Sequence, residues 1–511
     1  MSRALIRASI AFVVALFLLA ACVPIPAPES ARTLAPAATS QGAAQPKRLT
    51  ILYTNDEHGW LAAQKNKDGS SIGGAAEMLG HWREQEGYTP DGPFLVLSGG
   101  DMWTGPAISS WFNGDSAAEV MNLMGYQAAA VGNHEFDFGL DALRRHAKDA
   151  RFPFLSANLV KKGTTEPPDF VRPYTVVDVD GVKVGIIGLT TRSTPETTNP
   201  KNVAEFEFLP YAAALARTVP EVRRAGADVV IALAHVCGLE MRTLAPKAKQ
   251  LGVDVLTAGH CHERIADNVA GLPLIGGGQY MQSYARLPLE IDAATRQVTA
   301  GKPEVISNRS SAADSSPTDA IVAARVAHWQ KQTDNALGEV IGYTKDGLAA
   351  RSNALLNLIT DAWLQTYPTA DVAMTNLGGF RQGIDAGPLT LGDIVGVLPF
   401  NDQIVDAAVT GAQLKENLDC CDSAVAGITY RDGKLLLADG TPVDPQKTYH
   451  VLINDFMAGG GDRYKFDKQD PNAYFTAIDW RQPVIDTLKR LGTSEKEPLE
   501  LHLDSGARTG R

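Results

Sequence analysis

Several histidines of this chain stand close to other side chains that can bind a metal ion. The polar residues concerned are Asp56, His58, Asp101, Asn133, His134, His235, His260 and His262. Asp56 and His58 are two residues apart, and His260 and His262 repeat that spacing. On an extended segment, residues two apart point to the same side, so each pair would present both side chains together. The chemistry that these side chains share is metal coordination.

Each of these short motifs alone is weak evidence, because a single histidine at the end of a strand is more often a satisfied polar residue than a ligand. The combination is far more specific, since five separate segments supply nitrogen and oxygen donors. A mixture of imidazole, carboxylate and amide suits Zn, Mn, Co, Fe or Ni, and is unlike an all-oxygen calcium site. The donors exceed the needs of one tetrahedral ion. We therefore expect two ions bridged by a shared carboxylate.

Short apolar runs precede these polar residues and would position them. The runs occupy residues 49–59, 94–101, 128–139, 182–190, 229–238 and 253–262. Their β-branched content is typical of buried strands, and all except 182–190 close on His, Asp or Asn. Helical patterns such as 74–86 and 211–225 lie between them, which predicts an α/β layered domain. Active sites in such folds collect in loops beyond the strand ends.

Length and charge limit the remaining choices. The chain has 511 residues, which favours two domains over one. Its formal net charge of −11 argues against a nucleic-acid polymer as partner, because such partners require a basic surface. An acidic protein can still bind a small anion when bound metal ions supply local positive charge.

The first residues are typical of a targeting segment. Arg3 and Arg7 precede an apolar run at 10–19 that is too short to span a bilayer comfortably. The run ends in Leu-Ala-Ala-Cys at 19–22, which resembles a bacterial lipobox with Cys22 as the lipidation site; an ordinary signal peptide is the alternative. Residues 1–22 are thus predicted to be a lipoprotein signal peptide. We expect an exported lipoprotein that faces the periplasm or the cell exterior and contacts the membrane only through its lipid.

The composition of the chain changes after the targeting segment and again near residue 308. Residues 23–47 are rich in Pro and Ala and are interpreted as a disordered tether. Residues 308–336 are predicted to be a linker followed by a connecting helix at 319–336. A second domain is expected at 337–505, with a helix at 353–366, a Gly-rich turn at 376–383 and a strand within 448–455.

The five polar motifs together resemble those of the calcineurin-like metallophosphoesterases. They read N-D-E-H-G (55–59), G-G-D (99–101), G-N-H-E-F-D (132–137), A-H-V-C-G (234–238) and G-H-C-H (259–262). Within these enzymes the chain resembles the bacterial 5′-nucleotidase, UDP-sugar hydrolase and 2′,3′-cyclic phosphodiesterase group over nearly all of 48–505. The resemblance implies an α/β metallophosphoesterase domain at 48–307, with two sheets flanked by helices. A smaller α/β substrate-binding domain, the 5′-nucleotidase C-terminal domain, would follow at 337–505.

The resemblance also implies roles for the clustered residues. One divalent ion, with Zn, Mn or Co expected, would be held by Asp56, His58, Asp101 and His262. The other would be held by Asp101, Asn133, His235 and His260. Family members often have Gln where this chain has His262, and His is an equally suitable ligand.

Two such ions polarise a phosphoryl oxygen and lower the pKa of a bound water, whose hydroxide would attack phosphorus. His134 would then stabilise the transition state or protonate the leaving oxygen. Asp137, three residues on, would orient His134; the alternative is that it only caps a turn.

Motifs of the second half resemble the family's substrate-binding domain. They are N-L-G-G-F-R (376–381), L-P-F-N-D (398–402) and N-D-F-M-A-G-G-G-D (454–462). The resemblance implies that Arg381 binds phosphate with help from Asn376, that Phe456 stacks on a base and that Asp462 accepts hydrogen bonds from ribose. The glycines of these motifs are also consistent with plain turns, and Phe456 with a core residue.

The chain departs from the family pattern at three places. Leu377 stands where bacterial members often have a second Arg, and Arg351 is displaced from the position of another. The family places the base between two aromatic rings, and the first is expected near 420–427, where this chain has none. We therefore expect a clamp with one aromatic ring.

The resemblance implies an exported phosphohydrolase that acts on nucleoside 5′-monophosphates or related nucleotides by attack of the hydroxide described above. A cyclic phosphodiesterase, a sugar-nucleotide hydrolase or a thiosulfate-ester hydrolase on the same scaffold is the alternative. A metal-binding or solute-binding lipoprotein without turnover is a third interpretation. His134 argues against it, because the proposed ligand set does not require that residue.

The cysteines support fewer conclusions about structure and function. Cys237 and Cys261 each lie within two residues of a proposed ligand, and we interpret them as small buried fillers; a bridge between them or a thiolate ligand is the alternative. Cys420 and Cys421 are adjacent, and neighbours in sequence rarely bridge each other.

Overall fold

A computed structural model of the chain describes residues 45–311, 317–431 and 433–509. The predicted signal peptide, the lipidation site Cys22 and nearly all of the predicted tether lie outside the described residues. Part of the predicted linker, 312–316, lies outside them as well. Among the helices of the described ranges, none is long and apolar enough to cross a membrane.

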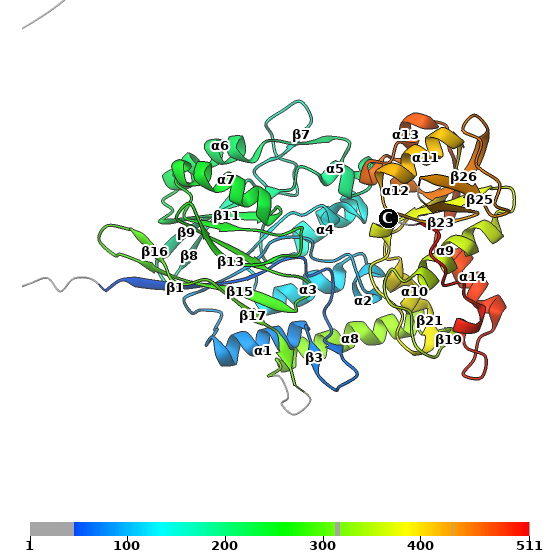
Figure 1. Ribbon diagram of the computed structural model, residues 1–511. Coiled ribbons are helices and arrows are strands. Elements are labelled where there is room, and N and C mark those ends of the chain that lie inside the picture. The colour runs from blue at the N-terminus through cyan, green and yellow to red at the C-terminus, as the bar shows by residue number, and fades with distance from the viewer. Residues whose placement is uncertain (1–44, 312–316, 432, 510–511) are drawn as a thin grey trace, which may run out of the picture. The chain divides into compact units, whose positions relative to one another are not determined.

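The first half of the described chain contains two large β-sheets (Figure 1). The first sheet has the strand order β16-β15-β1-β4-β5-β6, and β17 also pairs with β15. Its strands are β1 (Lys47–Thr54), β4 (Phe94–Ser98), β5 (Ala128–Ala130), β6 (Phe154–Leu155), β15 (Ser283–Ile291), β16 (Val298–Ala300) and β17 (Glu304–Ser307). Strands β1, β4, β5 and β6 run parallel, so their carboxyl ends share one edge of the sheet.

The second sheet has the order β13-β14-β12-β11-β9-β8. Its strands are β8 (Tyr174–Val179), β9 (Val182–Thr190), β11 (Val229–His235), β12 (Val255–Thr257), β13 (Arg264–Val269) and β14 (Leu272–Gly277). The four inner strands run parallel, and β8 and β13 pair antiparallel at the two edges. All six apolar runs of the sequence therefore form strands, and the polar residues that end them gather at carboxyl ends.

The two sheets pack face to face over a dry core. Ile51 and Leu97 of the first sheet and Leu233 and Ile275 of the second belong to one cluster of fully buried side chains. The other face of each sheet is covered by helices, so the strands are buried on both sides. This explains why β11 is apolar along nearly its whole length instead of alternating with polar residues.

Helices form the outer layers of this domain. The first sheet packs against α1 (Ala75–Gln85), α3 (Asp115–Met124) and α8 (Ala320–Leu337), whose side chains share one core cluster with it. The second sheet packs against α6 (Tyr211–Arg224) and α7 (Gly238–Leu251). Shorter elements complete the domain: β2 (Gln64–Lys65), β3 (Ser71–Ile72), β7 (Leu159–Lys161), β10 (Phe206–Phe208), β18 (Arg309–Ser310), α2 (Ala107–Ser110), α4 (Gly139–Asp149) and α5 (Thr194–Thr197).

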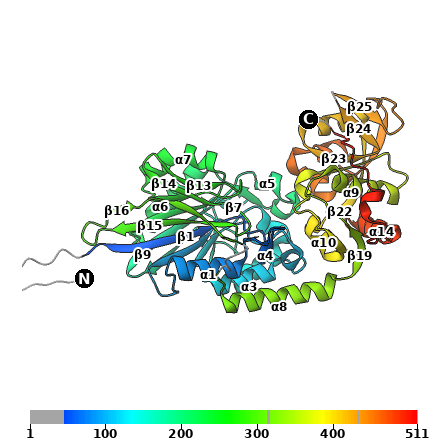
Figure 2. The ribbon, with the colours of Figure 1, turned by 60° about the horizontal axis from the view of Figure 1, so that its bottom comes forward.

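Helix α8 is the predicted connecting helix, and it packs along α1 and α3 before it leads into the second half of the chain (Figure 2). The side chain of Asp319 caps its first turn by accepting hydrogen bonds from the backbone N–H groups of Ile321 and Val322. Arg83 of α1 pairs with the same carboxylate. The indole N–H of Trp329 donates to Glu119 at 2.8 Å, which joins α8 to α3.

The second half is built on a five-stranded sheet of order β23-β20-β26-β22-β27. Its strands are β20 (Val372–Asn376), β22 (Gln403–Thr410), β23 (Ser423–Ala426), β26 (Thr448–Asn454) and β27 (Tyr474–Asp479). Helices α9 (Asn353–Thr366) and α14 (Gln482–Leu491) share a core cluster with Leu452, and α11 (Gly411–Cys420) shares another with Val451. Because successive side chains of a strand point to opposite faces, these two neighbours assign the helices to the two faces of the sheet.

Smaller elements surround this sheet: β19 (Val340–Thr344), β21 (Gly387–Thr390), β24 (Ile428–Arg431), β25 (Lys434–Leu437), α10 (Leu391–Val397), α12 (Asp455–Ala458) and α13 (Phe466–Gln469). The chain stays packed on this half beyond residue 505, where Arg508 pairs with Asp361 at 2.6 Å. The architecture confirms the predicted α/β class, in which a domain with two sheets flanked by helices precedes a smaller α/β domain.

Candidate active site

The polar residues that end the strands of the first half meet in one cluster. Three groups of their side chains offer donor atoms within 4.8 Å of one another: Asp56, His58 and His262; His58, Asp101 and His134; and Asp101, His235 and His260. Asn133 completes the cluster, with its Oδ1 3.2 Å from Nε2 of His235. All seven predicted metal ligands are therefore side by side, although they come from five segments of the chain.

The backbone at these residues differs from the extended conformation that the spacing suggested. Asp56, His58, Asp101, His260 and His262 all have positive φ angles, between 47° and 68°. Such angles are uncommon for residues other than glycine, and they cluster where function requires a particular side-chain direction. The paired side chains do converge, but they do so on left-handed turns after the strands and not because they alternate along one.

Hydrogen bonds between the loops hold these turns. The N–H groups of Asp56 and His58 donate to the carbonyl oxygens of Gly100 and Asp101, both at 2.9 Å. Gly132 is required for close packing here, because a Cβ atom at that position would lie 2.2 Å from Oδ1 of Asp101.

Two buried glutamates brace the same loops, and the sequence interpretation left both without a role. Glu135 accepts hydrogen bonds from the backbone N–H groups of Asp101 and Met102 at 2.9 and 2.8 Å. Glu57 accepts a hydrogen bond from the hydroxyl of Ser98 at 3.0 Å. Burial raises the pKa of Glu57 to about 8, and burial with the neighbouring Asp101 raises the pKa of Glu135 to about 7. Both stand inside the N-D-E-H and N-H-E-F motifs, a signal that could have identified them.

Two histidines are oriented by carbonyl groups. Nδ1 of His58 lies 2.8 Å from the carbonyl oxygen of Thr104, and Nδ1 of His235 lies 2.8 Å from that of Gly99. A ring that donates its Nδ1–H to a carbonyl keeps the lone pair of Nε2 free for a metal ion. Both Nε2 atoms face Asp101, at 3.8 Å from His58 and 3.0 Å from His235.

The cluster has the electrostatic character of a cation site. Oδ1 of Asp56 is buried and has no hydrogen-bond partner among the described residues. Burial opposes a charge on His235, but Asp101 and Asp56 outweigh it and raise the pKa of His235 to about 10. The local field therefore stabilises positive charge. Buried carboxylate, imidazole and amide donors in this arrangement fit divalent metal ions, with Asp101 facing both ends of the cluster.

His134 is held by Asp137 beside this cluster. Nδ1 of His134 lies 2.7 Å from Oδ2 of Asp137, and the hydroxyl of Thr198 donates to the other carboxylate oxygen at 2.9 Å. The backbone N–H of His134 donates to Oδ1 of Asp101 at 2.9 Å. Burial lowers the pKa of His134, but the charges of Asp137 and Asp101 outweigh it and raise that pKa above its ordinary value.

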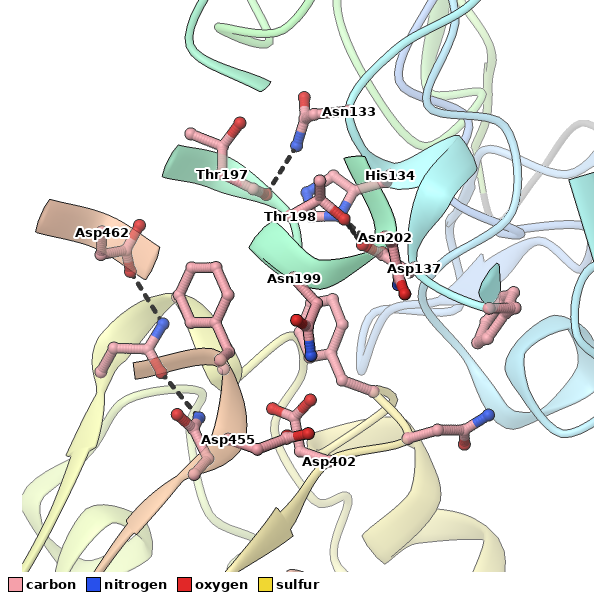
Figure 3. Close-up of a pocket in the computed structure, with 18 of the residues that line it drawn as sticks. Asn133, His134, Asp137, Thr197, Thr198, Asn199, Asn202, Asp402, Asp455 and Asp462 are labelled. Atoms are coloured by element: carbon pink, nitrogen blue, oxygen red, sulfur yellow. Dashed lines mark hydrogen bonds and ion pairs between the residues drawn. The ribbon is translucent and has the colours of Figure 1, made fainter. Parts of the chain in front are cut away.

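A cavity of about 610 Å³ joins the cluster to the second domain (Figure 3). Its lining includes all four predicted substrate-binding residues, which are Asn376, Arg381, Phe456 and Asp462. Nη2 of Arg381 lies 3.3 Å from Nε2 of His58, so this guanidinium is directly at the predicted metal ligands. Asn376 donates to Oδ2 of Asp462 at 2.8 Å, a contact drawn in Figure 3.

A second aromatic ring lines the cavity, from a segment other than the one where the sequence interpretation expected it. Phe400 lines the cavity together with Phe456, and its ring centroid lies 5.8 Å from that of His134. Phe400 belongs to the L-P-F-N-D motif and stands in the loop before β22, and the sequence interpretation gave it no role. Asp402, Asp455 and Lys201 also line the cavity and were missed.

The interpretation of Cys237 and Cys261 as unbridged fillers is wrong. They form a disulfide across 24 residues, which ties the start of α7 to the loop that carries His260 and His262. Cys420 and Cys421 are bridged as well, as a disulfide between neighbours.

Comparisons with known proteins agree with this geometry. Residues 338–469 match the family described as 5′-nucleotidase, C-terminal domain, and residues 96–264 match that of the bacterial capsule synthesis protein PGA_cap. The chain is 28% identical to the 5′-nucleotidase of Bos taurus over 521 residues, which cover 86% of this chain and 88% of that protein. It is 28% identical to the endonuclease YhcR of Bacillus subtilis over 80% of this chain, but spans only 37% of that longer protein.

Similarity to solved structures extends over both halves of the chain. The 5′-nucleotidase precursor from Thermus thermophilus matches with a TM-score of 0.77 and 25% identity, covering 91% of this chain and 99% of that one. The two family matches fall on different halves of this chain, and the structural match spans both. The chain is thus similar to 5′-nucleotidases over both halves, and residues 338–469 match their C-terminal domain.

Proposed function

We propose that the protein is an exported phosphohydrolase that uses two divalent metal ions to remove phosphate from nucleoside 5′-monophosphates. The observation that carries this proposal is the continuous cavity that joins the predicted metal ligands to Arg381, two phenylalanine rings and Asp462. A phosphate at the ligand cluster and a nucleoside against the second domain would occupy one space. The match of residues 338–469 to the 5′-nucleotidase C-terminal domain supports the same substrate class.

The proposed ligand sets follow the geometric groups. Asp56, His58, Asp101 and His262 hold one ion. Asp101, Asn133, His235 and His260 hold the other, and Asp101 is shared. Zn, Mn or Co suits this mixture of donors. When bound, such ions polarise the phosphoryl oxygens and lower the pKa of a coordinated water.

The chain's own residues then act on the phosphate and the leaving group. The guanidinium of Arg381 binds phosphoryl oxygens through a pair of parallel hydrogen bonds. Nδ1 of His134 is held by Asp137 at 2.7 Å, which leaves Nε2 to donate a hydrogen bond or a proton to the leaving oxygen. Asp137 thus acts through His134, as a positioning residue.

The nucleoside would be held by the second domain. Phe456 and Phe400 offer ring faces for stacking on a base, which is sequence-tolerant because every base has such a face. Asp462 is fixed by Asn376 and accepts hydrogen bonds from ribose hydroxyl groups. Burial raises the pKa of Asp462, and the hydrogen bond from Asn376 opposes that rise.

The remaining proposals concern organisation and location. We propose a catalytic domain at 48–307, a linker and connecting helix at 308–336, and a substrate-binding domain at 337–505. The lipobox pattern at 19–22 supports a lipid anchor on Cys22 after cleavage of the signal peptide, followed by a tether at 23–47. The protein would then be held at the outer side of a membrane, in the periplasm or at the cell exterior.

A substrate panel tests the function. The metal-stripped protein is assayed with Mn, Co or Zn on AMP, UDP-glucose, 2′,3′-cyclic AMP and an aryl phosphate, and products are separated chromatographically. We expect metal-restored hydrolysis that favours AMP. Preference for the aryl phosphate or the cyclic ester would retain the metal centre but reject the nucleotidase, and binding of two ions without turnover would favour a binding protein.

A further inference from the structure

Two carboxyl groups face each other on the wall of the pocket formed by the second domain. Asp402 directly precedes β22, Asp455 begins α12, and both line the cavity. The backbone N–H of Gln403, the residue after Asp402, donates to Oδ1 of Asp455 at 3.4 Å, which brings the two aspartates close together. Figure 3 shows them on the opposite side of the cavity from Asn133 and His134, with Asp402 facing Asn199 across the space.

Together these groups present an acidic surface rich in hydrogen-bond acceptors. Burial and the charge of Asp455 raise the pKa of Asp402 well above its ordinary value. The charge of Asp137, which also lines the cavity, acts on Asp402 in the same direction, so several acidic groups meet at this wall. Arg481 opposes this charge only in part, because its Nη2 is bound to Asp479 at 2.7 Å.

Lys201 also lines the pocket, but it does not neutralise the pair. Its Nζ lies over the ring of Phe475, 4.1 Å from the centroid. The pocket wall therefore favours a ligand group that donates hydrogen bonds and disfavours one that carries negative charge or only lone pairs.

The two stacking rings stand next to this pair in the chain. Asp402 is two residues after Phe400, and Phe456 directly follows Asp455. One face of Phe456 lies against the backbone of Gly461, where a Cβ atom would approach the ring to 2.3 Å, so the opposite face is left for a base. A base stacked on a ring presents its donors and acceptors in its own plane, at its edge. That edge would meet the carboxyl pair.

We propose that Asp402 and Asp455 are specificity-determining residues that select nucleoside monophosphates whose base carries an amino group at this edge. Adenine and cytosine meet this requirement, whereas hypoxanthine and uracil place a carbonyl oxygen in the same position. The inference rests on the proposed nucleotidase function and names the substrates within it. An amino group donates to the carboxylate oxygens, while a carbonyl oxygen would face them with lone pairs only and leave a buried acceptor unpaired.

The expected discrimination follows from the strength of hydrogen bonds to charged groups. One such bond, gained with the amino base and lost with the carbonyl base, corresponds to about a 10–100-fold difference in kcat/KM. AMP and IMP differ by this group while sharing ribose and phosphate. A general loss of activity therefore cancels in their ratio.

The test compares kcat/KM for AMP and IMP in the wild-type protein and in Asp402→Asn, an isosteric change whose amide can donate to a carbonyl oxygen. Dissociation constants of adenosine and inosine, measured by calorimetry, give a second readout that requires no phosphate chemistry. Asp406→Asn is the matched control, because Asp406 pairs with His450 and does not line the cavity. We expect an AMP-to-IMP ratio of at least about tenfold in the wild type, reduced by about tenfold in Asp402→Asn and unchanged in the control.

The outcomes separate this inference from the proposed function. Hydrolysis of AMP and IMP at equal rates by the wild type would overturn the inference and leave a nucleotidase. A wild-type ratio that persists in Asp402→Asn would also overturn it, since the pair would then only join the loop before β22 to α12. Hydrolysis of an aryl phosphate without hydrolysis of any nucleotide would instead reject the proposed function itself.

Discussion

Replacement of Asp137 by Asn isolates the contribution of its charge to the action of His134. In the structure Nδ1 of His134 lies 2.7 Å from Oδ2 of Asp137, and the side chains are only 12% and 4% exposed. The hydroxyl of Thr198 donates to the other carboxylate oxygen. An amide can reproduce this geometry, because its oxygen can accept from the imidazole and its NH₂ can donate to the hydroxyl. Asp137→Asn should therefore keep the ring in place and remove only the negative charge.

The magnitude follows from the difference between two kinds of hydrogen bond. A bond to a charged partner contributes about 1.5–3 kcal/mol, and a neutral one about 1 kcal/mol. The loss of about 0.5–2 kcal/mol corresponds to a decrease in kcat of about 2–30-fold. His134→Ala removes the group itself and should lower kcat by about 10²–10⁴-fold, the usual range for a general acid or base.

The assay measures kcat for AMP at saturating metal, together with metal content by mass spectrometry, in both variants. Asp141→Asn is the control, because the carboxylate of Asp141 is fully exposed on α4. Both active-site variants should retain full metal content. If Asp137→Asn were as impaired as His134→Ala, Asp137 would have a direct role and not a positioning one. Loss of metal in His134→Ala would contradict the ligand assignment.

Four further changes probe the packing of the site and of the second domain. Phe400→Ala should raise the KM for AMP by about 5–100-fold through loss of one stacking face, with Phe456→Ala for comparison, and equal KM values for AMP and ribose 5-phosphate would exclude stacking. Chelation of the metal should destabilise the domain that carries the predicted ligands by about 2.7 kcal/mol, relative to protein with metal at a hundredfold excess over its Kd, because bound metal stabilises only the folded state. Calorimetry should then show a lower transition temperature for that domain and an unchanged one for the second domain. Loss of the Cys237–Cys261 disulfide should lower the free energy of unfolding, measured with denaturant, by about 3 kcal/mol and should weaken metal binding. Unchanged metal affinity would show that the bridge does not position the predicted ligands. Burial raises the pKa of Glu500, but hydrogen bonds from Thr344 and the N–H of Asp346 outweigh it and lower that pKa to about 2. Glu500→Gln should therefore destabilise the second domain at pH 7, by only about 1 kcal/mol because solvent screens this site. The difference in free energy of unfolding between the wild type and the variant should shrink as the pH falls from 4.5 to 2, because the carboxylate becomes protonated. A difference that persists at pH 2 would refute this link between the charge of Glu500 and stability.

The parts of the site that the sequence predicted are those encoded locally. Each predicted ligand follows a buried strand, and parallel strands bring their carboxyl ends to one edge, so Asp56 and Asp101 were expected to be neighbours once the first sheet was inferred. His235 ends a strand of the second sheet and joins them through the packing of the two sheets. The same reasoning placed the helices that cover the sheets, because burial on both faces leaves a continuous apolar run. No knowledge of the loops was needed for either conclusion.

Loop conformation was not accessible in this way. The left-handed backbone at Asp56 and His58 depends on hydrogen bonds to Gly100 and Asp101, which belong to a different loop, after β4. A two-residue spacing predicts convergent side chains on a strand, and the same convergence arises here from a different backbone. The inferred pairing was right although its geometric reason was not.

The sequence by itself thus determined the fold class, the resemblance to 5′-nucleotidases and the side chains that meet in the cluster, because these depend on the order of strands and the residues that end them. Only the tertiary structure decided the substrate pocket. Phe400 and Phe456 line one cavity with Asp402 and Asp455, and Cys237 is bridged to Cys261, through packing of loops that no local pattern links. Contacts between distant loops are set by how whole elements pack, and the spacing of residues along a single segment carries no record of that.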